Sequence, residues 1–318
     1  MAKLGIIGVG RVGSQVLTDA QYLGHFSEIV VIDTNENLAQ GEVLDHRHLQ
    51  GLNHTHRTKL QVGGYQDLVD ADIVIVSASA ASTPDMKDRT LLTKANSVIV
   101  NDVFRQLSAV TKEAVVILIS NPVDAMTYLA HQAGYPADKV IGTGTILESS
   151  RFRTLIADHY NVDPKDVEGF VLGEHGSHCV PIWSRVRIHG IDLPEFEQLS
   201  GHTPIDRGAI STRIDEVSFE VFKKKGWTNS AISRASVQLA QSILFDEHTI
   251  EPISGLVQGA YGLVDGALSL LTLVDRTGIK QRLPIELSEE EHQQLEAAHE
   301  FIQTAIKQGE AAIQEQVK

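Results

Sequence analysis

The stretch that decides the fold is Leu4-Gly-Ile-Ile-Gly8-Val-Gly10-Arg-Val-Gly13. Its apolar first half predicts a buried strand, and the strand ends in glycines, which favour a tight turn. Apolar residues then recur at helical spacing as far as Gly24, a typical helix terminator. The stretch therefore predicts a strand, a tight turn and a helix.

A second apolar run, Ile29–Ile32, closes with Asp33, twenty residues after Gly13. In the dinucleotide-binding fold an acidic residue at about this distance meets the adenosine ribose. Gly8 would then allow the turn, and Gly10 would let the phosphates approach the backbone at the helix N-terminus. Thr34 and Asn35 follow Asp33, and neither is an arginine that could bind the 2′-phosphate of NADP. This favours NAD over NADP.

Composition excludes several classes of protein. With 318 residues, 42% of them hydrophobic, the chain can bury a large core in two domains or one large α/β unit. The net charge of -14 argues against nucleic acid or an anionic membrane as partner. Cys179 is the only cysteine, so we expect no disulfide and no thiolate metal site, and we expect Cys179 itself to act as a small, partly buried hydrophobic residue. Without a signal peptide or a membrane-spanning apolar run, we expect a cytoplasmic protein.

The first half of the chain alternates strands and helices. Buried strands are predicted at 60–62, 73–77, 115–119 and 140–142, and helices at 35–49, 88–107 and 122–133. This alternation indicates an α/β fold with a Rossmann-type, doubly wound parallel sheet, whose ligands bind beyond the carboxyl ends of the strands. We expect a dinucleotide-binding domain over residues 1–142.

From residue 143 the pattern changes to a mixed one, and we expect an α+β catalytic domain over residues 143–318. Its predicted elements are a helix at 148–160, strands at 167–172 and 180–188, polar linkers, a helix starting near 228, strands at 253–257 and 267–273, and a helix at 288–316. The last helix opens with a capping box formed by Ser288 and Glu291.

Two groups of residues could carry chemistry. His175 lies between glycines directly after an apolar strand, where a general base would be exposed to substrate. Glu148 and Arg151 share one face of a predicted helix, either as a surface ion pair or as parts of a site. A metal site built on His46-x-His48 and His54-x-His56 is an alternative, but these histidines lie in a polar stretch without a cysteine ligand. We therefore expect no metal.

Six motifs in one order give these residues a context. They are Gly8-x-Gly-x-x-Gly13, Asp33, Asp88-Arg89 with Asn96, Ser120-Asn-Pro-Val-Asp124, Glu148-x-x-Arg151 and Gly173-Glu-His-Gly176. Over almost its whole length the chain resembles the L-lactate/malate dehydrogenase family. Within that family it is most similar to enzymes of the L-lactate and L-2-hydroxyisocaproate type.

The resemblance implies an NAD-dependent L-2-hydroxy acid dehydrogenase. His175 would exchange a proton with the substrate oxygen, and Arg151 would hold the substrate carboxylate. Arg89, on a closing loop, would polarise the reacting oxygen beside Asn121. Glu148 stands where the family usually has Asp to orient the histidine, so the strength of that pairing is open.

The resemblance also assigns binding residues and partners. Thr228 joins the substrate-binding residues. Those expected to bind NAD are Gly8, Val9, Gly10, Val12, Gly13, Asp33, Ser77, Asn96, Ile119 and Asn121. The expected ligand is a small 2-oxo or 2-hydroxy acid, and the family implies a homodimer or homotetramer. The family's fructose-bisphosphate site pairs an arginine with a histidine, but here Glu168 accompanies Arg153, so we predict no such activation.

Departures from the family pattern bear on the substrate. Ser82 or Thr83 occupies the position where an arginine would meet a second carboxylate, which disfavours malate. Ser230 stands where many members have a large aromatic residue. Small residues at both walls, Ser82 or Thr83 on one and Ser230 on the other, suggest a roomier pocket. We therefore expect a 2-oxo acid with a medium or branched alkyl side chain, as in L-2-hydroxyisocaproate, with pyruvate and L-lactate as the alternative. A non-catalytic NAD-binding protein is a further alternative, but it would not need all four polar site residues.

Overall fold

A parallel sheet forms the centre of the N-terminal half of this computed structural model, which describes residues 2–52, 57–80 and 89–316, with only the backbone at 89–91. Its strands run in the order β3-β2-β1-β4-β5-β6, the doubly wound order expected from the sequence. They are β1 (Lys3–Ile7), β2 (Glu28–Ile32), β3 (Lys59–Val62), β4 (Ile73–Val76), β5 (Val115–Leu118) and β6 (Val140–Gly142).

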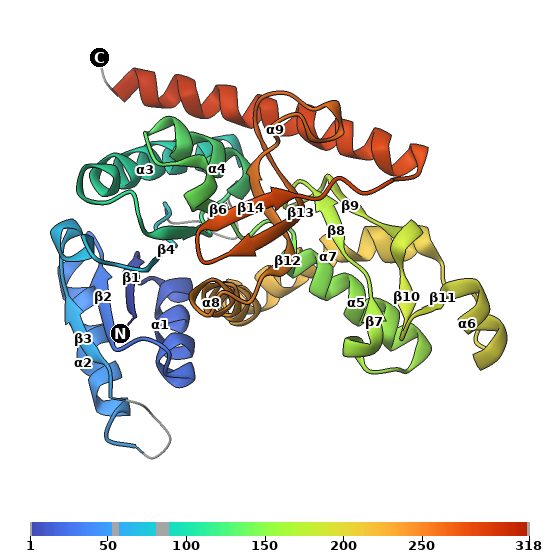
Figure 1. The fold of residues 1–318 in the computed structure, drawn as a ribbon, viewed down its shortest axis with the longest axis horizontal. Coiled ribbons are helices and arrows are strands. Elements are labelled where there is room, and N and C mark those ends of the chain that lie inside the picture. The colour runs from blue at the N-terminus through green and yellow to red at the C-terminus, as the bar shows by residue number, and fades with distance from the viewer. Residues whose placement is uncertain (1, 53–56, 81–88, 317–318) are drawn as a thin grey trace.

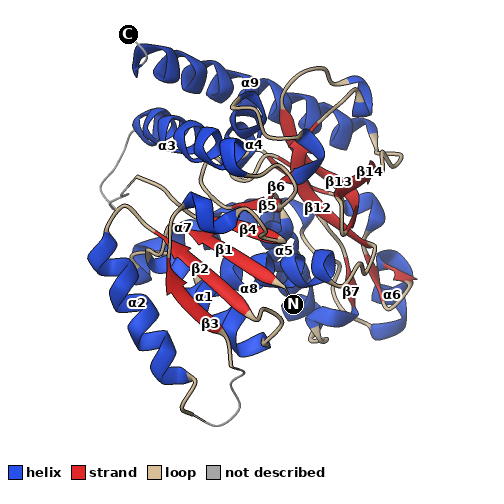
Figure 2. Cartoon of the chain, turned by 60° about the vertical axis from the view of Figure 1, so that its left-hand side comes forward, coloured by secondary structure: helices blue, strands red, loops and turns tan. Residues whose placement is uncertain are grey.

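Helices cover both faces of this sheet (Figures 1 and 2). They are α1 (Arg11–Leu23), α2 (Glu36–Leu49), α3 (Arg89–Val110) and α4 (Val123–Gln132). Two helices from the C-terminal half complete the layers: α8 (Ser230–Leu244) packs on α1, and α9 (Glu289–Gln316) packs on α3 and α4. The strands are therefore buried on both sides, which is why they appear in the sequence as continuous apolar runs.

The C-terminal half extends the same sheet with antiparallel strands. β12 joins β6 by pairing Ser254 with Gly142, and β13, β8 and β9 follow outward, while β14 pairs with β13. A small second sheet contains β11, β10 and β7, and α5, α6 and α7 lie around it. The bounds are α5 (Ile146–Tyr160), β7 (Val167–Glu168), β8 (Val171–Gly173), β9 (Cys179–Pro181), β10 (Arg187–Ile188), β11 (Ile191–Asp192), α6 (Leu193–Ser200), α7 (Arg207–Lys225), β12 (Thr249–Leu256), β13 (Ala267–Asp275) and β14 (Gly278–Arg282).

The sequence prediction is wrong in part of this half. The strands expected at 167–172 and 180–188 are each broken and contribute to two different sheets. The segment expected to hold polar linkers contains α6 and α7. Only Ile214 is buried among the residues of α7, so the helix lacks the apolar stripe by which a helix is recognised. The capping box is confirmed: the Ser288 amide donates to Glu291 Oε2 (2.8 Å), and the Glu291 amide donates to Ser288 Oγ (3.2 Å).

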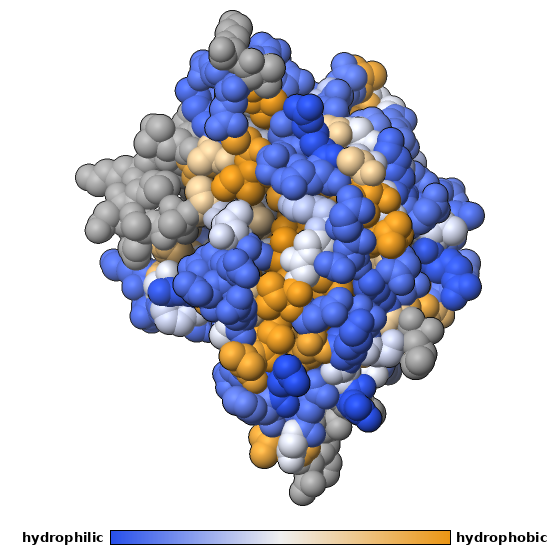
Figure 3. All heavy atoms as spheres, turned by 90° about the vertical axis from the view of Figure 1, so that its left-hand side faces the viewer, coloured by the Kyte–Doolittle hydropathy of each residue, from blue (hydrophilic) through white to orange (hydrophobic). Residues whose placement is uncertain are grey.

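Apolar side chains are exposed on one side of the molecule. Figure 3 turns the side with β3 and α2 toward the viewer and shows apolar surface between polar side chains. On α1 and α2, the exposed large apolar residues include Tyr22, Leu38 and Leu44. Among the described residues, no helix has both the length and the apolar character needed to span a bilayer.

Candidate active site and dinucleotide cradle

The glycine turn after β1 is shaped by close backbone contacts. Gly8 has φ +89°, a conformation that side chains disfavour. A Cβ atom at Gly13 would lie 1.9 Å from the Gly8 carbonyl oxygen, so only glycine lets α1 approach the strand this closely. Ser77, after β4, supports the same turn because its hydroxyl donates to the Gly8 carbonyl (2.9 Å).

Asp33 is fixed at the end of β2 beside this turn. Its Oδ2 accepts the amide of Val9 (2.8 Å), and its Oδ1 accepts the amide of Asn35 (2.8 Å). Both amides hold the carboxylate at the sheet edge where a dinucleotide ribose binds in this fold.

The N-terminus of α1 fits a phosphate group. In the described residues no side chain caps this helix, and its first turn contains no acidic residue. A Cβ atom at Gly10 would meet nothing within 4 Å, so the glycine leaves open space directly before the helix. Free amides at a helix N-terminus, together with open space, suit the diphosphate of a dinucleotide.

Asn96 and Asn121, both expected to bind the cofactor, are linked to each other. The fully buried Asn96 donates from Nδ2 to the Asn121 carbonyl (2.6 Å), and its Oδ1 accepts the Ala80 amide (2.7 Å). Asn96 therefore ties the segment after β4 to the segment after β5. The side chain of Asn121 is exposed at this edge, directly before a cis peptide bond to Pro122.

His175, Glu148 and Arg151 form a hydrogen-bonded chain centred on one carboxylate. Glu148 Oε2 lies 2.9 Å from His175 Nδ1, and Arg151 Nη1 donates to Glu148 Oε1 over 2.9 Å. The histidine follows β8, and the other two residues lie one turn apart on α5, which contacts β8. The structure thus brings a titratable imidazole and a guanidinium to one carboxylate, and the helical spacing had predicted only that Glu148 and Arg151 share a face.

A buried carboxylate that we did not single out fixes the histidine backbone. Asp124, at the start of α4, accepts the His175 amide with Oδ2 (2.8 Å) and the Ser269 hydroxyl with Oδ1 (3.0 Å). Glu174 is also buried and accepts the His178 amide (2.7 Å). Both carboxylates were visible in the quoted motifs, but only the fold shows that they surround His175.

The charges in this cluster shift each other's titration. Burial by itself would lower the pKa of His175, but the Glu148 carboxylate and its hydrogen bond outweigh burial and raise that pKa to about 9. Burial raises the pKa of Glu174 to about 7, and burial also raises the pKa of Asp124. Burial opposes ionisation of Glu148 as well, yet His175 and Arg151 together lower its pKa. The imidazole therefore holds its proton at neutral pH.

Some predicted residues have no described position at the site. Ser82 and Thr83 lie outside the described residues, and of Arg89 only the backbone, at the start of α3, is described. Thr228 lies between α7 and α8, and α8 contacts α5. Ser230 is the first residue of α8 and is exposed, with its hydroxyl donating to Asn229. The structure therefore gives no support to using Ser230 as a measure of pocket width.

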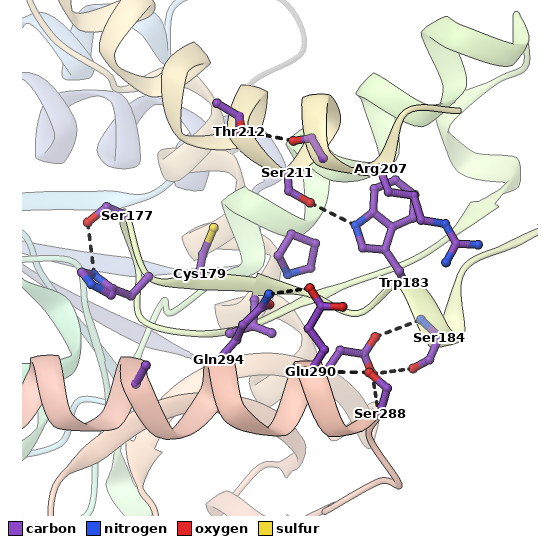
Figure 4. A pocket seen from close by; sticks show the side chains of 16 residues that line it. Ser177, Cys179, Trp183, Ser184, Arg207, Ser211, Thr212, Ser288, Glu290 and Gln294 are labelled. Carbon is purple, nitrogen blue, oxygen red and sulfur yellow. Dashed lines mark hydrogen bonds between the residues drawn. The ribbon is translucent and has the colours of Figure 1, made fainter. Parts of the chain in front are cut away.

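A separate cavity is lined by Ser177, Cys179 and Trp183, among others (Figure 4). Its volume is about 740 Å³, and its walls come from β9, the first turns of α7 and α9, and the segment around Trp183. The Trp183 indole donates to Ser211 Oγ (3.0 Å), and Glu291 accepts from Ser184, so these polar groups are already paired. Nothing in the sequence had indicated this cavity.

The histidines considered as metal ligands do not form a site in the described part of the chain. There, no group of three His, Cys, Asp or Glu side chains is placed to hold an ion. The ring of the buried His46 pairs instead with Thr18 Oγ1 (2.9 Å) and the Glu42 carbonyl (2.8 Å). His54 and His56 lie outside the described residues.

Three features together define a class of protein, the dinucleotide-dependent oxidoreductases. They are the doubly wound sheet, the cradle formed by the Gly8–Gly13 turn and Asp33, and the hydrogen-bonded chain of His175, Glu148 and Arg151. Comparison with protein families narrows it. The model of the lactate/malate dehydrogenase NAD-binding domain matches residues 2–142, and that of the family's alpha/beta C-terminal domain matches residues 145–313. The chain belongs to the lactate/malate dehydrogenase family, and its cofactor is NAD.

Individual relatives agree with this assignment. The chain is 36% identical to "L-lactate dehydrogenase 2" of Clostridium acetobutylicum, over 96% of each protein. It superposes with a TM-score of 0.90 on the minor L-lactate dehydrogenase of Enterococcus mundtii, at 29% identity and covering 96% and 98% of the two chains. Malate dehydrogenase of Cryptosporidium parvum gives the same score and identity, covering 98% and 99% of the two chains. Likeness of fold therefore does not distinguish lactate from malate enzymes.

Proposed function

We propose that this protein is an L-lactate dehydrogenase, which reduces pyruvate with NADH and oxidises L-lactate with NAD. The observation that carries the proposal is the bridge made by Glu148 between His175 and Arg151. The bridge supports the proposal because it holds an imidazole and a guanidinium close together, and reduction of a 2-oxo acid needs a proton donor and a carboxylate-binding cation near one substrate.

Each residue of the unit has a step that follows from its contacts. Arg151 would bind the pyruvate carboxylate through the guanidinium N–H groups not used by Glu148, and so orient C2. His175 would donate a proton from Nε2 to the C2 oxygen during reduction and take it back during oxidation. Glu148 would hold the proton on Nδ1 and stabilise the imidazolium. Asp124 would keep the histidine backbone in place.

The NAD-binding residues fit this reaction. The uncapped N-terminus of α1, the open space at Gly10 and the fixed Asp33 carboxylate suit a diphosphate and a ribose. When bound, the reduced cofactor supplies the hydride that C2 receives. The other predicted contacts, including Val12, Ile119 and the closing Arg89, stay part of the proposal.

Pyruvate is favoured over the two other candidate substrates. The only basic residue between β4 and Arg89 is Lys87, and neither Ser82 nor Thr83 could pair with the second carboxylate of oxaloacetate. The branched-chain preference rested on small residues at both walls of the pocket, Ser82 or Thr83 and Ser230. Ser82 and Thr83 lie outside the described residues, Ser230 is exposed, and the relative from Clostridium is named for lactate. We therefore replace the expectation of a hydroxyisocaproate-type substrate with pyruvate.

A substrate series with NADH tests the proposal. We expect kcat/KM to be highest for pyruvate, lower for 2-oxoisocaproate and lowest for oxaloacetate. A preference for oxaloacetate would contradict the proposal and indicate a malate dehydrogenase. Absence of turnover with every 2-oxo acid, despite NADH binding, would favour a non-catalytic NAD-binding protein.

We also propose a homodimer or homotetramer in the cytoplasm. Support for self-association comes from exposed apolar side chains on two helices, Leu38 and Leu44 on α2 and Phe219 and Val221 on α7. Contacts between identical subunits bury apolar side chains of this kind. Light scattering during gel filtration should give twice or four times the chain mass of 34.7 kDa, and a monomer would contradict the proposal.

A further inference from the structure

An arginine at the start of α1 lies in an electrostatically unfavourable place. Arg11 is the first residue of α1, and the positive end of a helix dipole repels a cation there. In the described chain no carboxylate pairs with its guanidinium, and the first turn of α1 holds no acidic residue. Arg11 is exposed, so its charge is accessible to an anion from solution.

The guanidinium is held by an aromatic ring from the other half of the chain. Arg11 Cζ lies 3.7 Å from the centroid of the Trp227 ring, which is a close cation–π contact. The contact is made where α1 packs on α8, since Trp227 lies just before that helix. Lys225 Nζ lies 5.8 Å from the same ring and donates to Asn229. Two cations and a positive helix end therefore converge on one aromatic side chain.

From this geometry we propose that Arg11 is a binding residue for the NAD diphosphate and that Trp227 positions it. The diphosphate is the anion that this fold places at the N-terminus of α1, and it would neutralise the charge that the protein leaves unpaired. Trp227 restricts the rotamers of a long side chain, so less entropy is lost when the anion binds. The proposal does not depend on which 2-oxo acid is the substrate.

The proposal has a structural consequence for the substrate half of the site. Trp227 directly precedes Thr228, a predicted substrate-binding residue. An anion that engages Arg11 would therefore also restrain the segment between α7 and α8. Cofactor binding and the placement of Thr228 are linked through one side chain pair.

Binding measurements test the role of Arg11 without relying on turnover. We expect Arg11→Gln to raise the Kd of NADH about tenfold by isothermal titration calorimetry, and to raise the Kd of ADP similarly. Adenosine, which has no phosphate, should bind both proteins alike. The salt dependence of NADH binding should also become shallower in the variant. Lys112→Gln, which removes the same charge at an exposed turn between α3 and β5, is the control and should change neither Kd.

The tryptophan gives a second, independent test. Trp227→Phe keeps an aromatic face and should retain NADH affinity within about twofold, whereas Trp227→Ala should weaken it about as much as Arg11→Gln. Unchanged NADH affinity in Arg11→Gln would overturn the proposal and leave the Arg11–Trp227 contact as a purely structural one. If Arg11→Gln loses as much affinity for adenosine as for NADH, the proposal is also overturned, because such a loss would indicate that the turn from Gly8 to Gly13 is distorted.

Discussion

The two halves of the active site are assembled in different ways. The dinucleotide cradle is local: the turn from Gly8 to Gly13 and the carboxylate of Asp33 lie at the ends of adjacent strands, β1 and β2. The catalytic cluster is not local, since His175, Glu148 and Asp124 come from the end of β8, from α5 and from α4. A mutation in the cradle should therefore act through backbone geometry, and one in the cluster through charge. The following predictions test that difference.

The largest expected effect is loss of the substrate-binding cation. Arg151→Gln should lower kcat/KM for pyruvate by about 10³-fold, or about 4 kcal/mol, because a desolvated carboxylate would lose its charged partner. The Kd of NADH should stay the same, since the cradle is untouched. Steady-state kinetics and calorimetry measure the two quantities.

Arg153→Gln is the matched control on the same helix. The Arg153 guanidinium donates to the Gly169 carbonyl (3.0 Å), away from Glu148. Per folded enzyme, its kcat/KM should stay within about threefold of the wild type. Equal losses in both variants would show that α5, and not the charge of Arg151, determines the activity.

Two glycines of the cradle should respond differently to one methyl group. Gly13→Ala places a Cβ atom against the Gly8 carbonyl and should destabilise the fold by roughly 3 kcal/mol. Gly10→Ala meets no protein atom within 4 Å, so its melting temperature should be unchanged while NADH affinity falls about tenfold or more. Thermal unfolding and NADH titration separate the effects. A stable Gly13→Ala protein that binds NADH normally would contradict the close approach of α1.

The pH dependence reports the charge coupling in the cluster. Because Glu148 outweighs burial and raises the pKa of His175 to about 9, the proton that reduction requires is retained until the pH approaches 9. The rate of pyruvate reduction should be independent of pH up to that range and then fall. The rate of lactate oxidation should rise over the same range. Glu148→Gln removes the charge and should move both limbs toward lower pH by at least about one unit. If the pH profiles of the wild type and of Glu148→Gln coincide, Glu148 does not raise the pKa of the group that titrates.

The smallest effect concerns the support of the histidine backbone. Ser269→Ala removes the hydroxyl that donates to Asp124 and should cost about 1 kcal/mol in the free energy of unfolding, measured with urea. Asp124 still accepts the His175 amide, so kcat should change less than about threefold. A large loss of kcat would mean that Ser269 also sets the position of the imidazole.

The comparison also explains what the sequence could predict. The strand, turn and helix around Gly8–Gly13, the doubly wound parallel sheet and the pair of Glu148 and Arg151 on one helix face follow from local patterns in the sequence. The roles of Asp124 and Ser269 do not, because they lie far apart in the chain and meet only when β13 packs beside α4. α7 was missed because almost none of it is buried. The cation–π pair of Arg11 and Trp227 depends on α8 packing on α1, and no local pattern reports such a contact.

The central claim is that His175 carries the proton of the reaction and that NAD binding does not depend on His175. The direct measurement compares His175→Asn with the wild type in NADH affinity and in turnover of pyruvate. We predict an NADH Kd within about twofold of the wild type and a kcat reduced by about 10³-fold or more. A kcat near the wild-type value, with NADH still bound, would contradict the account.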